Sequence, residues 1–325
     1  MPVIEQSDYK PPWYWRNAHL QTILPNRVRR VRSVDLVAQS TTIAGRDVNL
    51  FWSCVGSESV VVIAHGLGGH VNRPYVLGTV RAFNRVGCDA VAWHVWEDGD
   101  RDMAPHLSHG GATDGLRGIV HHLASQYRRV FLVGFSLGGN VVLKYLGEEE
   151  GSVIAAGAVA FSVPCDLESA AHRISEPDNH IYQSGFLRRL KRVVRQKSLL
   201  TPDQLSTDGL EEIDSLMAFD DRYTAPLNGF RNAHDYYTRC SSGSHLNGIR
   251  TPTLLVNARN DPFLTASCYP VEMCLSHDFV FLEMPESGGH VGFPLGRGVY
   301  WSEERALEFL SNQASLVRAE STKKE

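Results

Sequence analysis

The sequence predicts an α/β fold, in which helices flank a mostly parallel central sheet and a helical insertion interrupts it. Short apolar runs rich in β-branched residues, such as VVVIA at 60–64 and TLLVN at 253–257, alternate with amphipathic runs of helical length. This alternation is typical of a parallel sheet, because parallel strands need a crossover helix between them. The rhythm of strands stops between Ser162 and Arg250, which places the insertion there.

Each expected element follows from a local pattern. Two strands, 33–42 and 47–54, form an antiparallel pair at the start, and the second one alternates apolar with polar residues. The further elements are strand 60–64, helix 74–86, strand 89–95, helix 112–125, strand 129–134, helix 137–147 and strand 153–161, then, after the insertion, strands 253–257 and 279–284 and a helix from about 299 to 312. Residues 1–162 and 251–325 therefore make up the predicted core, and residues 163–250 the predicted helical cap.

The segment from Phe131 to Asn140 carries the strongest functional signal. Here a buried-looking strand leads into Gly134-Phe135-Ser136-Leu137-Gly138, which fits G-x-S-x-G, and a helix follows at once. A tight turn between strand and helix lifts the serine hydroxyl clear of the sheet, as a nucleophile elbow requires. The sequence therefore predicts Ser136 as a catalytic nucleophile.

A serine hydroxyl needs a base to remove its proton and an acid to orient that base. In enzymes with this elbow, the acid and then the histidine follow the serine along the chain. Asp261 comes just after the apolar run 253–257, and His290 lies in the loop after the run 279–284, so we expect both at the sheet edge that holds Ser136. The loop from Trp96 to Asp100 also follows a strand and offers an alternative acid.

An oxyanion hole is expected from two backbone N–H groups. One is that of Leu137, directly after the serine, and the other comes from the loop His65-Gly66-Leu67-Gly68-Gly69 after strand 60–64, where Leu67 is the expected donor. His65 could be imagined as a base, but it precedes the elbow in the chain. We interpret it as a structural histidine.

The motifs HGLGG, GFSLGGN, NARNDPFL and GGHVGF, in this order, resemble the α/β-hydrolase superfamily. Three further segments, RNAHLQTILP (16–25), SHGGATDGL (108–116) and FDDRYTAPLNGFRNAHDYYTRCSS (219–242), are similar to its YheT-like subgroup, whose plant relatives are named for embryogenesis. The resemblance runs from about Trp13 to about Phe309. It implies the α/β-hydrolase fold and an esterase or lipase whose nucleophile, acid and base are Ser136, Asp261 and His290. Gly115 stands where the subgroup suggests a second acidic residue.

The insertion contains a basic amphipathic helix. Its charges gather between Arg188 and Lys197, and Leu187, Leu190 and Val194 fall on one helical face. We expect a lid helix with solvated charges, whose apolar face covers the mouth above Ser136. The alternative is an interfacial helix attracted to anionic lipid. Asp220 and Asp221, later in the insertion, are expected to anchor the cap or a turn rather than to form a second acid pair.

These observations predict a carboxylic-ester hydrolase that works through an acyl-enzyme on a small-molecule or lipid ester. An acyltransferase or lipid-remodelling enzyme on the same triad, and a non-catalytic binding protein of this fold, are the alternatives. We expect no metal and no organic cofactor, because backbone dipoles and one imidazole can handle the charge that develops in the reaction. The His121-His122 and His106/His109 pairs also lack an HExxH motif or a Cys/His cluster that would indicate a metal site.

Charge and hydropathy indicate which binding partners and which cellular location to expect. The net charge of −4 argues against general binding to nucleic acid. The N-terminal residues lack the pattern of a signal peptide, and no stretch approaches the roughly 18 apolar residues of a membrane span. The sequence therefore predicts a cytoplasmic protein without stable membrane insertion, with peripheral lipid contact left open.

Overall fold

Within the residues that the computed structural model describes (2–31, 34–43, 46–94, 107–150, 154–296 and 298–321), nine strands form one sheet. Their order across the sheet is β1-β9-β8-β7-β6-β4-β5-β3-β2. The bounds are β1 Val3–Ile4, β2 Val37–Ile43, β3 Arg46–Ser53, β4 Ser59–Ala64, β5 Asp89–Trp93, β6 Arg129–Phe135, β7 Gly157–Phe161, β8 Thr253–Val256 and β9 Val280–Glu283. Strands β2 and β3 pair antiparallel, β3 also runs antiparallel to β5, and the other pairs are parallel. The predicted mostly parallel sheet is confirmed.

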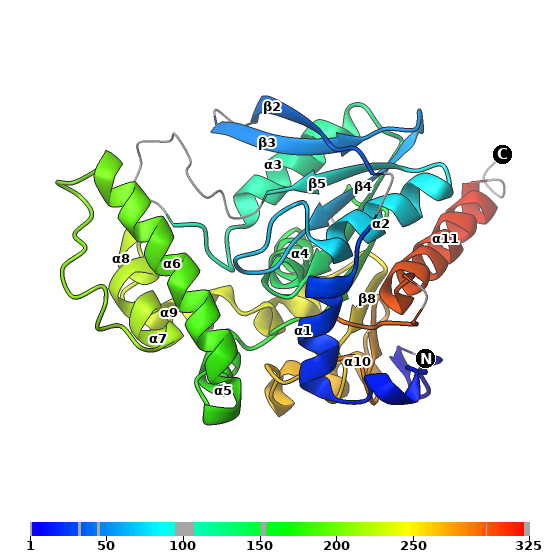
Figure 1. Cartoon of the computed structure of the whole chain (residues 1–325). Helices are drawn as coiled ribbons and strands as arrows, with labels where there is room; N and C mark the ends of the chain where they lie inside the picture. Colours follow the sequence, from blue (N-terminus) through cyan, green and yellow to red (C-terminus); the bar gives the residue numbers. More distant parts are fainter. Residues whose placement is uncertain are drawn as a thin grey trace.

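Two layers of helices cover the sheet (Figure 1). The main ones are α2 (Pro74–Arg85) and α11 (Trp301–Ser321) in one layer, and α3 (Thr113–Ala124) and α4 (Leu137–Glu148) in the other. Successive residues of β4 alternate between the layers, because neighbouring side chains of a strand point to opposite faces. Val61 and Ile63 pack in the cluster with α2 and α11, and Val62 packs in the cluster with α3 and α4. A strand buried on both faces reads as a continuous apolar run, as β4 does.

The N-terminal part differs from the expectation. The sequence pattern indicates no element before residue 33, yet β1 adds a parallel edge strand to β9, with Val3 opposite Leu282. A short helix, η1 (Trp13–Trp15), and α1 (Ala18–Val28) follow it. The sequence predicts α1 only weakly, because Pro25 lies inside it and its apolar residues do not gather on one face. Its position is decided by contacts with loops far along the chain.

Residues between β7 and β8 form helices and connecting loops. They are α5 (Leu167–Ile174), η2 (Pro177–Asn179), α6 (His180–Leu200), α7 (Leu216–Phe219), η3 (Asp220–Thr224), α8 (Ala225–Leu227), α9 (Ala233–Cys240) and η4 (Ser242–Gly248). Helices α6 to α9 lie together to one side of the sheet, at the left in Figure 1. Leu187, Val194, Leu210 and Phe219 belong to a separate buried cluster there, so this segment has apolar packing of its own.

Three short elements, η5 (Ala266–Cys268), α10 (Val271–Leu275) and a bridge between Pro294 and Tyr300, complete the described chain. The strand expected over 153–161 begins at Gly157, with 151–153 outside the described residues. The last helix begins at Trp301 and extends to Ser321, beyond the expected end. None of the described helices is both long and apolar enough to span a membrane. The cytoplasmic location stays a prediction.

Candidate active site

Ser136 occupies a strained turn between β6 and α4. Its φ of 54° and ψ of −124° lie in a region that residues with a side chain rarely adopt. The Ser136 N–H donates to the Phe161 carbonyl at 2.8 Å, and the Asn140 N–H donates to the Ser136 carbonyl at 3.0 Å. A Cβ at Gly134 would lie 2.6 Å from the Gly139 Cα, so glycine permits the close approach of strand and helix. Backbone hydrogen bonds and this close approach therefore hold the turn in place.

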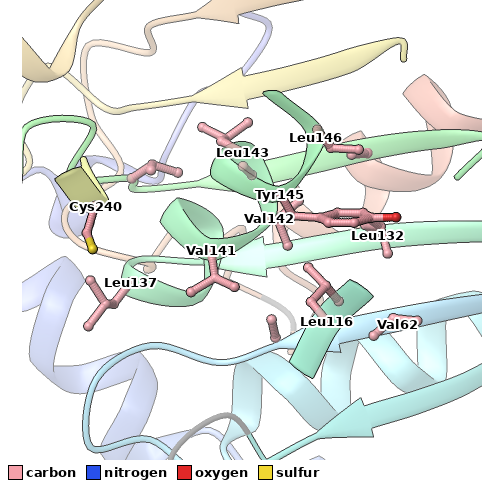
Figure 2. Close-up of a cluster of buried hydrophobic side chains, with 14 of the residues drawn as sticks. Val62, Leu116, Leu132, Leu137, Val141, Val142, Leu143, Tyr145, Leu146 and Cys240 are labelled. Carbon is pink, nitrogen blue, oxygen red and sulfur yellow. The ribbon is translucent and has the colours of Figure 1, made fainter. Parts of the chain in front are cut away.

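Helix α4 fixes this turn from behind, because it is buried along its length. Figure 2 shows side chains of α4, among them Val141 and Tyr145, in one buried cluster with Leu132 of β6 and Leu116 of α3. Asn140, which is fully buried, donates to the carbonyls of Gly110 and Cys240 at 2.8 Å each. The first turn of α4 is thus tied to two other loops.

Three predicted side chains come together at this turn. His290 Nε2 lies 2.8 Å from Ser136 Oγ, and His290 Nδ1 lies 2.9 Å from Asp261 Oδ2 and 3.1 Å from Oδ1. The loops after β6, β8 and β9 supply the three residues, as parallel strands in one sheet allow. The Asp261 carboxylate has no exposed surface and also accepts the Phe263 N–H at 3.0 Å. The alternative acids Asp98 and Asp100 lie outside the described residues. Asp261 is the carboxylate beside Nδ1, the His290 ring nitrogen that faces away from Ser136.

The loop after β4 approaches Ser136 closely. A Cβ at Gly66 would lie 2.9 Å from the Ser136 Cβ. The Gly69 N–H donates to the Gly66 carbonyl at 2.9 Å and closes the turn around Leu67. The Gly66 N–H donates to the Tyr75 hydroxyl at 3.3 Å. The backbone at Gly66 therefore lies beside the serine.

His65 is a buried neutral imidazole. Burial lowers its pKa to about 3, and the ring packs edge-on against His94 at 5.1 Å between centroids. Its Nδ1 lies 2.9 Å from the Gly66 carbonyl oxygen. It is His290, and not His65, that contacts Ser136 Oγ, which agrees with the structural interpretation of His65.

The face of α6 that reaches the site is not the predicted one. Leu187, Leu190 and Val194 lie in an apolar cluster with α7 and the later loops of the insertion, and Leu107 of the core joins this cluster. The amphipathic pattern correctly indicates a buried face, but that face does not cover the mouth. Apolar side chains from α7 and the later loops of the insertion, together with Leu107, cover it instead.

A neighbouring face of α6 contacts the site instead. Tyr182 and Phe186 pack on Phe263, with ring centroids 4.7 Å and 6.0 Å apart, and Phe263 lies 4.4 Å from the His290 ring. Two turns after Tyr182, Arg189 donates to the Gly68 carbonyl at 3.0 Å. Positions 182, 186 and 189 share one side of a helix. Helix α6 thus reaches from the histidine side of Ser136 to the loop after β4.

The sequence reasoning assigned no role to these aromatic residues or to Gln21 and Thr22 of α1. Thr22 Oγ1 accepts the His290 N–H at 2.9 Å, and Gln21 Oε1 accepts the Gly288 N–H at 3.0 Å. Gln21 and Thr22 both lie in the RNAHLQT motif. The similarity of this motif to a subgroup motif is the sequence signal that could have identified them.

Asp220 and Asp221 take structural positions, as expected. The Thr224 and Tyr237 hydroxyls donate to the Asp220 carboxylate at 2.6 and 2.7 Å, and the Ala233 N–H donates to Asp221 at 3.0 Å. In the part of the chain that the structure describes, no three His, Cys, Asp or Glu side chains gather as a metal site would require. His106 falls outside that part.

The chain matches the model of the alpha/beta hydrolase family over residues 61–298. It is 30% identical to the candidate esterase YheT of Escherichia coli (strain K12), over 94% of this chain and 93% of that protein. It is also 30% identical to a monoacylglycerol lipase of Saccharomyces cerevisiae, over 78% of this chain and 59% of that protein. A solved esterase from Pyrococcus furiosus has the same fold, with a TM-score of 0.55 at 16% identity over 93% of this chain and 99% of that one. The chain therefore belongs to the alpha/beta hydrolase family, in its YheT-like branch.

Proposed function

We propose that this protein is a carboxylic-ester hydrolase that uses Ser136, His290 and Asp261 as a catalytic triad. The observation that carries the proposal is the relay of short contacts, 2.8 Å from Ser136 Oγ to His290 Nε2 and 2.9 Å from His290 Nδ1 to Asp261. The names of its relatives, a candidate esterase and a monoacylglycerol lipase, support a small or lipid ester as substrate.

In the proposed mechanism, Ser136 Oγ attacks the ester carbonyl while His290 Nε2 takes the hydroxyl proton. Asp261 holds the imidazole in the tautomer that has its proton on Nδ1, and it stabilises the imidazolium that forms. His290 then returns the proton to the alcohol as the C–O bond breaks, which leaves an acyl group on Ser136. Water, deprotonated by the same imidazole, attacks the acyl-enzyme and releases the acid.

The negative charge on the carbonyl oxygen is assigned to the backbone N–H groups of Leu67 and Leu137. Leu137 begins α4, so its N–H is among the donors that a helix leaves without an intrahelical acceptor. On the other loop, the Gly66 N–H is directed to Tyr75, which favours the next residue, Leu67, as the donor. Each such donor contributes roughly 10²–10³ to the rate in well-studied serine hydrolases.

A series of p-nitrophenyl esters from acetyl to palmitoyl tests the proposal. We expect turnover by the wild-type chain, no turnover by Ser136→Ala, and labelling of Ser136 by a fluorophosphonate, which reacts only with an activated serine. Adding glycerol as acceptor separates the alternatives, because an acyltransferase would form glycerol ester in place of free acid. Absence of both turnover and labelling in the folded wild-type chain would favour the non-catalytic binding protein.

A further inference from the structure

Helix α1 packs against the loop that carries His290, although the two are far apart in the sequence. The Thr22 hydroxyl accepts the His290 N–H at 2.9 Å and donates to the Ala18 carbonyl at 2.8 Å, so its orientation is set from within α1. The adjacent residue, Gln21, is fully buried, and its Oε1 accepts the Gly288 N–H at 3.0 Å. Two side chains of one helix thus hold the backbone on either side of Gly289.

Gln21 also connects the histidine loop to the acid loop. Its Oε1 accepts a second hydrogen bond, from Asn260 Nδ2 at 2.9 Å, and Asn260 directly precedes Asp261. Asn260 Oδ1 in turn accepts the Gly289 N–H at 2.9 Å. A closed set of bonds therefore fixes the position of the Asp261 loop relative to the His290 loop.

The histidine loop needs such external support because its own backbone is strained. Val291 has a φ of 63°, which is a rare conformation for a β-branched residue, and Phe293 has a φ of 47°. Residues in such regions persist only where surrounding contacts over-determine them. The Val291 N–H donates to the Ser162 hydroxyl at 2.9 Å, so Thr22 and Ser162 hold consecutive N–H groups of this loop.

Space at this contact is equally restricted. Gly289 has a φ of 58°, and a Cβ there would lie 2.7 Å from the Gln21 Cβ and 2.9 Å from Thr22 Oγ1. The loop therefore contacts α1 directly, without room for water between them. A shift of α1 would move the backbone of His290.

We propose that Thr22 and Gln21 are positioning residues, which hold the His290 imidazole in line between Ser136 and Asp261. The inference rests on the proposed catalytic role of His290. Their bonds reach the backbone of Gly288 and His290 rather than the imidazole, so they act through the histidine loop. Misplacement of a catalytic group by about 1 Å can lower a rate about 100-fold, and the hydrogen bond that the His290 N–H donates to Thr22 is the direct restraint on this backbone.

The test compares Thr22→Val with Thr22→Ser in the full chain. Valine keeps the shape and removes the acceptor, whereas serine keeps the acceptor. We expect T22V to lower kcat, and the rate at which a fluorophosphonate labels Ser136, by about 10- to 100-fold with little change in KM. T22S should stay close to the wild type in both measurements.

Asn17→Ala is the matched control. Asn17 caps α1 by accepting the Leu20 N–H at 3.0 Å, and it has no hydrogen bond to the histidine loop among the described residues. N17A should destabilise α1 yet leave the labelling rate nearly unchanged. If Thr22 only stabilised α1, N17A and T22V would instead lower the labelling rate alike. Gln21→Met, which removes the Oε1 acceptor at similar volume, provides a second variant if T22V does not fold.

The downfield proton resonance of His290 Nδ1–H provides a readout that does not depend on activity. It should be present in the wild type, T22S and N17A, and shifted or broadened in T22V, with His290→Ala used for assignment. If folded T22V and Q21M showed the labelling rate and the resonance of the wild type, the inference would be overturned, and the proposed hydrolase function would stand. A wild-type chain that shows this resonance but no labelling would contradict the proposed function instead.

Discussion

At the scale of single residues, the contact between Asp261 and His290 determines which imidazole nitrogen can accept a proton. Because Asp261 accepts from Nδ1, Nε2 is left as the base that faces Ser136. We predict that Asp261→Asn lowers kcat on a p-nitrophenyl ester by about 10⁴-fold, since the amide favours the opposite tautomer. The isosteric side chain can still accept the Phe263 N–H, so the unfolding temperature should change little. A loss of less than tenfold would mean that another carboxylate serves as the acid.

At the scale of elements, α6 uses separate faces for stability and for the site. Phe186 packs on Phe263, next to His290, whereas Leu187 is buried in the apolar cluster that the insertion forms with Leu107. We predict that Phe186→Ala changes the preference among acyl chain lengths and raises KM, because it opens space beside the histidine. Fluorophosphonate labelling of Ser136 should remain.

Leu187→Ala is the control for that prediction. It should lower the free energy of unfolding by about 2–5 kcal/mol, as truncation of a buried leucine does, and leave the chain-length profile unaltered. The ester series together with chemical denaturation measures both effects. An altered profile in L187A but not in F186A would reverse the assignment of the two faces.

At the scale of the whole molecule, one carboxylate in the insertion links stability to pH. Loss of hydration raises the pKa of Asp220 to about 6, although hydrogen bonds from Thr224 and Tyr237 oppose the shift. A raised pKa means that the folded state favours the protonated form. Its contribution to stability is therefore complete below the ordinary pKa of 3.8 and is lost as the pH rises through about 6.

We predict that Asp220→Asn removes this dependence. Relative to the wild type, the variant should gain about 1–2 kcal/mol in free energy of unfolding between pH 4.5 and pH 7.5, measured by urea denaturation. Because Asp220 is partly exposed to solvent, the expected gain in free energy of unfolding is smaller than the full pKa shift would give. A constant difference between the two proteins across this range would show that Asp220 titrates normally.

The amino-acid sequence by itself determined the central strands and the three proposed catalytic residues. Runs such as 60–64 and 131–134 are short, apolar throughout and rich in β-branched residues, which is typical of buried strands in a sheet covered on both faces, and the elbow motif depends on residues that are neighbours in the chain. Asp261 and His290 followed from chain order and from their places after two further strands.

Tertiary structure decided what covers each buried face and what supports the histidine loop. Periodicity shows that one face of α6 is apolar, but the partner of that face depends on how the rest of the insertion folds. The bond from the His290 N–H to Thr22 joins residues 268 positions apart, and β1 pairs with β9 over almost the full chain. Contacts of this kind leave no local pattern, because each partner looks like an ordinary polar or apolar residue until the chain brings the two together.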